Sequence, residues 1–403
     1  MATVAVLGAL DTKGVEFAYL IGLLQARQHA VLLIDTGILG ESSLQPNIHA
    51  EQVAEAGGES LSNLRDHHER GPAMHVMAHG AAKVVTALYE AGQIDAIIGM
   101  GGSGGTSVFA AAVRDLPVGF PKLLVSTMAS GDTRSIVGTK DLILVPAVVD
   151  VAGLNRISHR VIANAANAVC GMVEGSIEEI PTDRPIIAVS MLGNTTPAVE
   201  AARPLLEAAG YEVLVFHVVG SGGRTMESLV MDGLVAGVLD LTTTELASEL
   251  TGAPCTAGPE RLTAAGRRAI PQLISVGCLD FSIFGRRETI PEQYRNRNLY
   301  DWNLETTLMR TTPEESAQLG KLIALRANAA QGPVAVMLPL AGYSQVGAAG
   351  QPFWMPQADA ALFTAIRANL RPDVKLIEMG THINDPRFAE KAAQMMLNLM
   401  GQK

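Results

Sequence analysis

A glycine-rich turn between a short apolar run and a helical pattern is the feature that most limits how this chain folds. The apolar run covers residues 95–99, and five glycines fall within seven positions, at Gly99, Gly101, Gly102, Gly104 and Gly105. Residues 108–113 then continue with helical periodicity. A buried strand that turns through glycines into a helix leaves the first amides of that helix unpaired and directs the positive end of its dipole outward.

This turn predicts a binding site for an anion such as phosphate. Without Cβ atoms the backbone can approach an anion closely, and Thr106 and Ser107 add hydroxyls where the helix is expected to be capped. The alternative is a tight turn in which glycine only permits packing. The residues expected to contact the ligand are Gly101, Gly102, Ser103, Gly104, Gly105, Thr106 and Ser107.

A nicotinamide dinucleotide is a less favoured ligand for this turn than a nucleotide phosphate alone. Gly99, Gly101 and Gly104 fit the pattern G-x-G-x-x-G. However, the next predicted strand, residues 122–125, ends in Ser126 instead of the acidic residue that binds the ribose. The Walker motif G-x-x-x-x-G-K-[ST] does not occur in the chain.

Short apolar runs alternate with helical patterns along the whole chain. Such alternation predicts parallel sheets covered by helices on both faces, with ligands beyond the carboxyl ends of the strands. A polar stretch with two prolines, residues 174–185, separates two halves. We therefore predict two doubly wound, Rossmann-like α/β domains with mostly parallel sheets, residues 1–178 and 185–403, and a cleft between them. The strands are expected at 3–7, 30–34, 95–99, 122–125 and 142–145, and then at 186–190, 212–218, 235–239, 273–276, 334–338 and 374–377.

Helices are expected between these strands, and one segment fits neither pattern. Residues 280–303 are richer in Arg, Asn and aromatic residues and lack a clear period, so we interpret them as an excursion that serves as a lid or an oligomer contact. The helices with the clearest period are predicted at 15–28, 73–91, 108–113, 155–171 and 226–231.

Composition narrows the class of protein. A chain of 403 residues exceeds the usual size of a single core. The net charge of −10 argues against a nucleic-acid surface, and no apolar run is long enough to span a bilayer. Three scattered cysteines give no disulfide framework and no CxxC metal site, and the start of the chain lacks the pattern of a signal peptide. We expect a cytoplasmic protein without nucleic-acid or membrane partners.

Polar residues follow several predicted strands of the first half. Lys13 could neutralise a phosphate, and Asp11 could hold Mg²⁺ through water. The alternative is that Asp11 or Thr12 caps a helix. The candidate nucleotide-binding residues at these strand ends are Asp11, Thr12, Lys13, Thr36, Ser126, Thr127, Ser130, Gly131 and Asp132.

The second half repeats the glycine turn after a strand. We expect Gly220, Ser221, Gly222, Gly223 and Arg224 to bind a small-molecule substrate, with Arg224 directed toward its anionic group across the cleft. The alternative is that Arg224 only stands at the start of a helix, where it would pair with Glu227.

Four further residues of the second half are candidate catalytic groups. Asp240 and Glu245 flank three threonines at a strand-to-helix turn, where Glu245 could be a general base or a residue of a capping box. His382 and Asp385 could act together in proton transfer, or Asp385 could simply start a helix. The sequence identifies no metal ligands: the pair His75 and His79 is better explained as a helix face, and the cysteines are interpreted as structural.

Several motifs spread along the chain occur together in one known family. They are 8–14, 99–107, 126–132, 148–155, 220–227, 240–245 and 382–386. In this combination the chain resembles the Tm-1-like ATP-binding domain family over nearly its whole length. The resemblance implies a two-subdomain α/β fold, ATP binding and homodimerisation or higher homo-oligomerisation. It supplies no reaction.

The chain departs from this family in one loop. Residues 339–344 are similar to the family's Pro-Leu-Arg-Gly-x-Ser segment, but Ala341 stands in the place of the arginine. Gly347 and Met355 stand where acidic residues are expected. A role of this loop in binding substrate or metal is therefore in doubt for this chain.

Three functions are compatible with these features. The first is an ATP- and Mg²⁺-dependent enzyme that acts on a small metabolite bound between the two domains. The second is a non-catalytic ATP-binding module that stabilises an oligomer or a partner complex. The third is an ATP-independent isomerase or lyase of carbohydrate acids, whose glycine turns hold a substrate phosphate or carboxylate.

Overall fold

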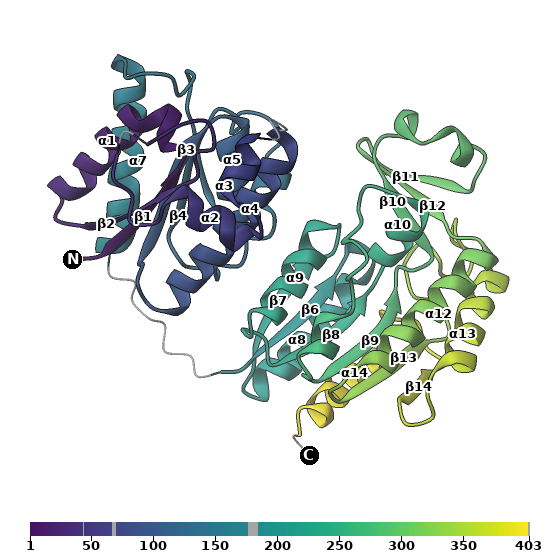
Figure 1. The fold of residues 1–403 in the computed structure, drawn as a ribbon. Helices are drawn as coiled ribbons and strands as arrows, with labels where there is room; N and C mark the ends of the chain where they lie inside the picture. Colours follow the sequence, from purple (N-terminus) through teal and green to yellow (C-terminus); the bar gives the residue numbers. More distant parts are fainter. Residues whose placement is uncertain (43, 67–69, 176–183, 402–403) are drawn as a thin grey trace. The chain divides into compact units, whose positions relative to one another are not determined.

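Parallel strands form the centre of both halves of the chain (Figure 1). The computed structural model describes residues 1–42, 44–66, 70–175 and 184–401. The chain divides into two units, Met1–Ile180 and Pro181–Lys403. Each unit has a parallel sheet with helices on both faces, which confirms the predicted α/β class with Rossmann-like, mostly parallel sheets.

The sheet of the first unit has five parallel strands in the order β2-β1-β3-β4-β5. The strands are β1 (Thr3–Gly8), β2 (Ala30–Asp35), β3 (Ala96–Gly101), β4 (Lys122–Ser126) and β5 (Ile143–Pro146). The helices are α1 (Leu10–Ala26), α2 (Ala50–Gly57), α3 (Leu61–Asp66), α4 (Arg70–Glu90), α5 (Ser103–Ala112), α6 (Arg134–Val137) and α7 (Arg156–Glu174).

Alternate side chains of each strand enter different cores. In β1, Ala5 and Leu7 pack in the core formed with α2, α4 and α5, whereas Val4 and Val6 pack in the core formed with α1 and α7. A strand buried on both faces reads as a continuous apolar run, which is the pattern from which these strands were predicted.

The sheet of the second unit has six parallel strands in the order β14-β13-β9-β8-β6-β7. Helices α8 and α14 cover one face, and α9 to α13 cover the other. The strands are β6 (Ile186–Met191), β7 (Glu212–His217), β8 (Gly237–Thr242), β9 (Gln272–Gly277), β13 (Val334–Pro339) and β14 (Lys375–Met379). The helices are α8 (Thr196–Ala208), α9 (Ser221–Met231), α10 (Glu245–Thr251), α11 (Ala264–Arg267), α12 (Pro313–Ala329), α13 (Pro356–Asn369) and α14 (Pro386–Leu399).

The excursion at 280–303 opens a small antiparallel sheet, which the sequence pattern did not reveal. Its strands are β10 (Phe281–Phe284), β11 (Leu299–Asn303) and β12 (Thr306–Arg310), in the order β10-β12-β11. β11 is mostly exposed and β10 is only four residues long, so neither gives a period of two that can be recognised. A role as lid or oligomer contact stays a prediction.

Three helices each begin five residues earlier than predicted. α1 begins at Leu10 instead of residue 15, α5 at Ser103 instead of 108, and α9 at Ser221 instead of 226. Glycine and polar residues are tolerated in a first turn, because its amides have no partner within the helix. The cap of α5 is Gly102, so the prediction that Thr106 and Ser107 stand at the capping position is wrong.

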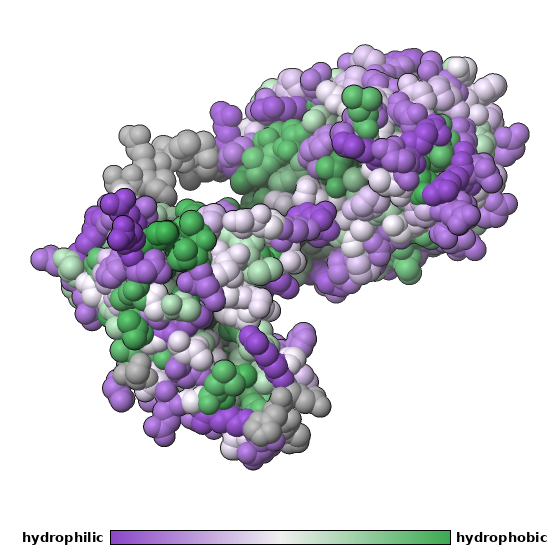
Figure 2. Space-filling view, turned by 90° about the horizontal axis from the view of Figure 1, so that it is seen from above, coloured by the Kyte–Doolittle hydropathy of each residue, from purple (hydrophilic) through white to green (hydrophobic). Residues whose placement is uncertain are grey.

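Apolar residues reach the surface of both units in patches among polar ones (Figure 2). In the part of the chain that the structure describes, no helix is both long enough and apolar enough to cross a membrane.

The contact between α2 and α4 depends on a glycine, which gives a test of the fold. A Cβ on Gly80 would lie 1.8 Å from the carbonyl oxygen of Val53 in α2, whereas a Cβ on Gly71 in the same helix would meet no atom within 4 Å. Gly80→Ala should therefore lower the stability of the first unit by about 1–3 kcal/mol through overpacking. Gly71→Ala should be neutral or stabilise by up to about 1 kcal/mol. Thermal unfolding of both variants checks this, and equal midpoints would contradict the packing described.

Candidate functional site

The carboxyl edge of the first unit's sheet contains a topological switch point. β1 and β3 are neighbours, but the helices that follow them lie on opposite faces of the sheet. The turns after these strands, Ala9–Leu10 and Gly102–Ser103, therefore diverge at the point where the strand order reverses. In open α/β sheets, ligands bind at this topological switch point.

The amino end of α5 offers backbone amides without partners. Gly102 caps the helix without a side-chain hydrogen bond, and the first backbone bond runs from the Thr106 amide to the Gly102 carbonyl at 2.9 Å. The amides of Ser103, Gly104 and Gly105 make no hydrogen bond to another described residue. Three unpaired amides at the positive end of a helix are suited to bind an anion.

The guanidinium of Arg70 lies beside these amides, and sequence reasoning missed this residue. A Cβ on Gly104 would lie 3.4 Å from Nη2 of Arg70 and 3.3 Å from Cε of Met74, so both side chains reach over the glycine turn. Arg70 is the first residue of α4 and is exposed. The packing of α4 against α5 brings it here. No local sequence signal reports such a contact, because it depends on how two helices pack.

Two of the hydroxyls expected to bind the ligand bind each other instead. Thr106 and Ser126 are buried, and their Oγ atoms lie 2.6 Å apart. Ser126 Oγ also accepts a hydrogen bond from the Met128 amide at 2.9 Å. This pair ties α5 to the loop after β4. The other candidate hydroxyls of these two turns belong to exposed residues, namely Ser103, Ser107, Thr127 and Ser130.

The loop after β4 places one exposed hydroxyl beside the glycine turn. A Cβ on Gly102 would lie 3.8 Å from Thr127 Oγ1. Asp132 is further along this loop and pairs with Arg134, whose guanidinium lowers the pKa of the Asp132 carboxyl to about 2. Gly131 closes a turn by donating to the Met128 carbonyl.

The turn after β1 is held by the neighbouring loops. Asp11 Oδ2 accepts hydrogen bonds from the amides of Leu39 and Gly40 at 2.8 and 3.2 Å, while its Oδ1 is buried without a partner among the described residues. Ala9 is the cap of α1, so neither Asp11 nor Thr12 caps this helix. Lys13 Nζ donates to the Val151 carbonyl, which gives this ammonium a partner in the loop after β5.

The ends of β2 and β5 complete this edge. Asp35 Oδ1 accepts from the amides of Leu10 and Gly37, and burial raises the pKa of its carboxyl; the next residue, Thr36, is buried. Val148, after β5, has a φ of 66° and sits in a turn closed by a 2.7 Å bond from the Val149 amide to the Ala147 carbonyl. A positive φ is strained for a β-branched residue, and such strain is concentrated at functional sites.

The second glycine turn already holds an anion supplied by the chain itself. The amides of Gly220 and Gly223 donate to Oε1 of Glu245 at 2.6 and 3.1 Å. A Cβ on Gly223 would lie 1.9 Å from Oε2 of the same carboxylate. These two amides are therefore not open to a substrate in this structure. Ser221 is exposed and Gly222 half-buried at the same turn.

Glu245 belongs to a buried ionic cluster around Arg261. The guanidinium binds Asp240 through two bonds of 2.5 and 2.7 Å and Glu245 through one of 2.7 Å, and all three side chains are fully buried. Burial raises the pKa of Glu245, against the opposing effect of Arg261. The catalytic role of Asp240 and Glu245 stays a prediction, but their exposure and partners are those of structural groups.

The other candidates of the second half are not joined as expected. Arg224 donates to the Thr256 carbonyl at 3.0 Å. Glu227, its suggested partner, accepts instead from the amides of Leu262, Thr263 and Ala264. Arg224 thus has a partner in the loop after α10 and does not pair with Glu227, while its role in binding a substrate stays a prediction.

His382 and Asp385 each have separate partners. His382 Nδ1 accepts from the Asn384 amide at 3.1 Å, so its Nε2 donates to the Ser344 carbonyl at 3.0 Å. Asp385 caps α14 and pairs with Arg387, which lowers the pKa of the Asp385 carboxyl to about 2. No hydrogen bond joins these two side chains among the described residues, and the helix-start alternative describes Asp385 correctly.

A buried carboxyl that sequence reasoning missed lies at the carboxyl end of β9. Asp280 is 1% exposed, and burial raises its pKa to about 6 despite the guanidinium of Arg310. Its Oδ2 accepts a hydrogen bond from Ser344 Oγ, and its Oδ1 has no partner among the described residues. A Cβ on Gly347 would lie 2.1 Å from Oδ2. In this structure an acidic side chain at position 347 would therefore have no room beside Asp280.

Comparison with known proteins identifies relatives along the whole chain. The models of the Uncharacterised protein family (UPF0261) match residues 2–178 with their N-terminal domain and 184–400 with their C-terminal domain. A UPF0261 protein of Clostridium tetani (strain Massachusetts / E88) is 44% identical over 398 residues, which cover 98% of each chain. One of Rhizobium meliloti (strain 1021) is 41% identical over 394 residues, covering 97% of this chain and 98% of that one.

A plant relative matches as well. The ToMV resistance protein Tm-1(GCR237) of Solanum lycopersicum is 39% identical over 352 residues, which are 85% of this chain and 46% of the tomato protein. This match confirms the resemblance to the Tm-1-like family. Among solved structures, a UDP-N-acetylglucosamine 2-epimerase from Rickettsia bellii aligns over 99% of this chain and 96% of its own, with 9% identity and a TM-score of 0.23. Values that low carry no argument about function.

The raised pKa of Asp280 predicts a dependence of stability on pH. The pKa of Asp280 in the folded protein, about 6, lies above the ordinary 3.8. The contribution of this carboxyl to folding stability is therefore fully present below about pH 4 and is lost as pH rises through 6. Asp280→Asn keeps an acceptor for Ser344 but cannot ionise. Between about pH 4 and pH 7 the free energy of unfolding of the wild type should therefore fall by roughly 2–4 kcal/mol relative to that of this variant. Unfolding of both proteins across that range checks this, and a difference that does not change with pH would contradict it.

Proposed function

The chain belongs to the Uncharacterised protein family (UPF0261), and from that premise we propose that its first unit binds ATP. The bound phosphates would lie on the amides of Ser103, Gly104 and Gly105. In this proposal the protein is an ATP- and Mg²⁺-dependent enzyme that acts on a small metabolite. The observation that carries the proposal is the amino end of α5, where unpaired amides stand under the guanidinium of Arg70.

The residues at this edge fit a triphosphate and its cation. The space above Gly104 is bounded by the flexible ends of Met74 and Arg70, so an anion can approach the backbone with little rearrangement. Arg70 supplies a fork of donors suited to phosphate. Asp11 Oδ1 is the acceptor left without a partner among the described residues, and it is the atom that would hold Mg²⁺, directly or through water.

Exposed apolar residues on the surrounding loops suit the base of a nucleotide. Leu39 follows β2, Met128 follows β4 and Val148 follows β5, and these side chains are 80, 45 and 74% exposed. Apolar side chains beside convergent polar groups are typical of small-molecule sites. These loops all leave the same edge of the sheet as the amides of α5, because the strands are parallel.

A non-catalytic ATP-binding module is the second candidate. The observation that favours it is the burial of Asp240 and Glu245 against Arg261, which leaves these predicted acids without access to a substrate. In this version ATP stabilises a homodimer or another assembly. Turnover of ATP with a metabolite would exclude it, whereas ATP-dependent assembly without turnover would favour it. Turnover of a carbohydrate acid that ignores ATP would exclude both candidates.

Obstruction of the glycine turn tests the ATP proposal. Mg-ATP at about 100 times its Kd should stabilise the wild type by about 2.7 kcal/mol, or roughly 5–10 °C in Tm for a unit of this size. Gly104→Val should abolish this shift, because its side chain occupies the path of the phosphate. The matched control is Gly171→Val in α7, where a Cβ meets no atom within 4 Å, and it should keep the full shift.

Two further comparisons sharpen this test. Arg70→Met should reduce the ATP shift while leaving the free protein folded, because the guanidinium is exposed. NADH should give no comparable shift, since Ser126 ends the strand where the ribose-binding acid is needed. A folded Gly104→Val protein with an unchanged ATP shift would refute this placement, and strong stabilisation by NADH would refute the choice of ATP.

A further inference from the structure

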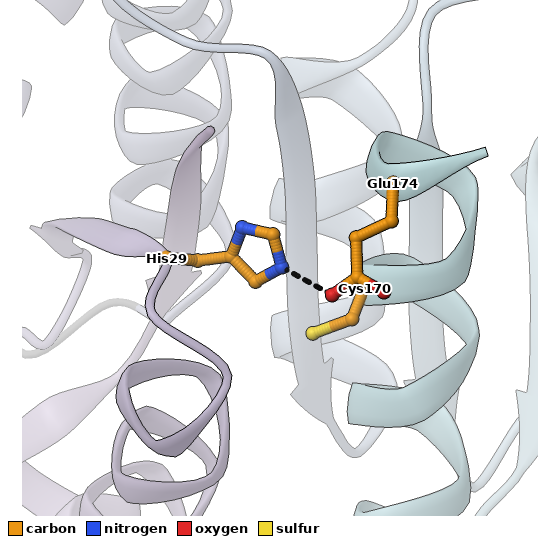
Figure 3. Close-up of side chains that lie close together, drawn as sticks. All are labelled: His29, Cys170 and Glu174. Carbon is orange, nitrogen blue, oxygen red and sulfur yellow. Dashed lines mark hydrogen bonds and ion pairs between the residues drawn. The ribbon is translucent and has the colours of Figure 1, made fainter. Parts of the chain in front are cut away.

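Three side chains that can bind a metal ion meet at the amino edge of the first unit's sheet (Figure 3). His29 precedes β2, and Cys170 and Glu174 lie near the end of α7. One ligand atom of each residue, His29 Nε2, Cys170 Sγ and a carboxylate oxygen of Glu174, lies within 4.8 Å of the other two. His29 Nε2 and Glu174 Oε1 are 2.9 Å apart.

Local structure accounts for the convergence of these residues. Cys170 and Glu174 are four residues apart on one helix, so their side chains project from the same face. α1 and α7 pack side by side through Leu24 and Val169. The chain that leaves α1 therefore passes the end of α7, and His29 is fixed there by a bond from its amide to the Leu24 carbonyl.

We propose that His29, Cys170 and Glu174 form a binding site for a transition-metal ion such as Zn²⁺. Imidazole, thiolate and carboxylate are the three kinds of side chain that bind Zn²⁺ in proteins. In a tetrahedral site with ordinary bond lengths the ligand atoms lie roughly 3.3–3.6 Å apart. The atoms here need shifts of about 1 Å to enclose the ion. Glu174 is 40% exposed, so it gives the ion a route from solvent and leaves one position open to water or a further ligand.

Residues around the three ligands are arranged to support them. Arg27 binds Oε2 of Glu174, which leaves Oε1 for the metal and fixes the direction of the carboxylate. Arg27 is itself held by Asn167 Oδ1 at 3.3 Å. Carboxylates that bind metals commonly keep such an outer hydrogen-bond partner. His29 Nδ1 has no partner among the described residues, so the ring can carry its proton there and present the Nε2 lone pair to the ion.

Binding exchanges protons for the ion. The Sγ–H bond of Cys170 breaks as the Sγ–metal bond forms, and this proton passes to solvent. Nε2 must present its lone pair to the ion, so the proton in the hydrogen bond between His29 and Glu174 moves to Nδ1 or to solvent, and the bound ring is neutral with its one proton at Nδ1. The hydrogen bond between His29 and Glu174 is thereby replaced by two metal–ligand bonds. In the competing description these two residues are only an ion pair beside an ordinary buried thiol.

Titration of the reduced, full-length protein with Co²⁺ distinguishes the two descriptions. The proposal predicts one equivalent of bound Co²⁺, a thiolate-to-cobalt charge-transfer band in the near ultraviolet, and displacement by Zn²⁺. Cys170→Ser should lose the band. Cys255→Ser is the matched control, since Cys255 is a half-buried thiol outside the cluster, and it should keep the band unchanged.

A second variant covers the case in which Cys170→Ser does not fold, since Cys170 is fully buried. Glu174→Gln changes a partly exposed carboxylate, so it should fold and should weaken Co²⁺ binding by about tenfold or more, with Zn²⁺ stabilising it less than the wild type in thermal unfolding. The absence of a thiolate band in the wild type would overturn the proposal. A band that survives in folded Cys170→Ser, or affinity unchanged in Glu174→Gln, would do the same.

Discussion

A backbone amide at the start of a helix has no partner within that helix, and a fold must supply an acceptor or leave the amide open to solvent or ligand. Both units of this protein pass from a strand through a Gly-Ser-Gly-Gly sequence into a helix, so both create the same need. In the second unit Glu245 meets part of this need, because its carboxylate accepts from the amides of Gly220 and Gly223. In the first unit no described side chain accepts from Ser103, Gly104 or Gly105.

The buried carboxylate of Glu245 requires a charged partner within the second unit. A buried anion is costly unless it is paired, and Glu245 is paired with Arg261, which in turn binds Asp240. Burial disfavours the charge on Arg261, yet the two carboxylates outweigh this effect and raise the pKa of the guanidinium well above its ordinary value. This cluster closes the turn. The first unit has no such cluster in its described part, and its turn instead faces an exposed arginine and exposed apolar loops.

The sheets could be predicted from sequence because strands buried on both faces are continuous apolar runs, as in residues 96–101 and 334–339. The starts of α1, α5 and α9 could not, because a first turn of glycine and polar residues has no helical period. Chemistry-bearing residue types were recognised, but their partners were not. Arg70 over Gly104 and Glu245 on Gly223 are contacts between elements distant in sequence, and only the packed structure brings them together.

The two glycine turns differ in availability: the amides of Ser103, Gly104 and Gly105 are open to an anion, whereas those of Gly220 and Gly223 already bind Glu245. Nuclear magnetic resonance of protein labelled with ¹⁵N-glycine, titrated with Mg-ATP, tests this most directly, since each glycine amide reports on its own surroundings. The resonances of Gly104 and Gly105 should move with saturation while those of Gly220 and Gly223 stay in place. Movement of Gly220 and Gly223 with Gly104 and Gly105 unchanged, or no movement at all, would contradict it.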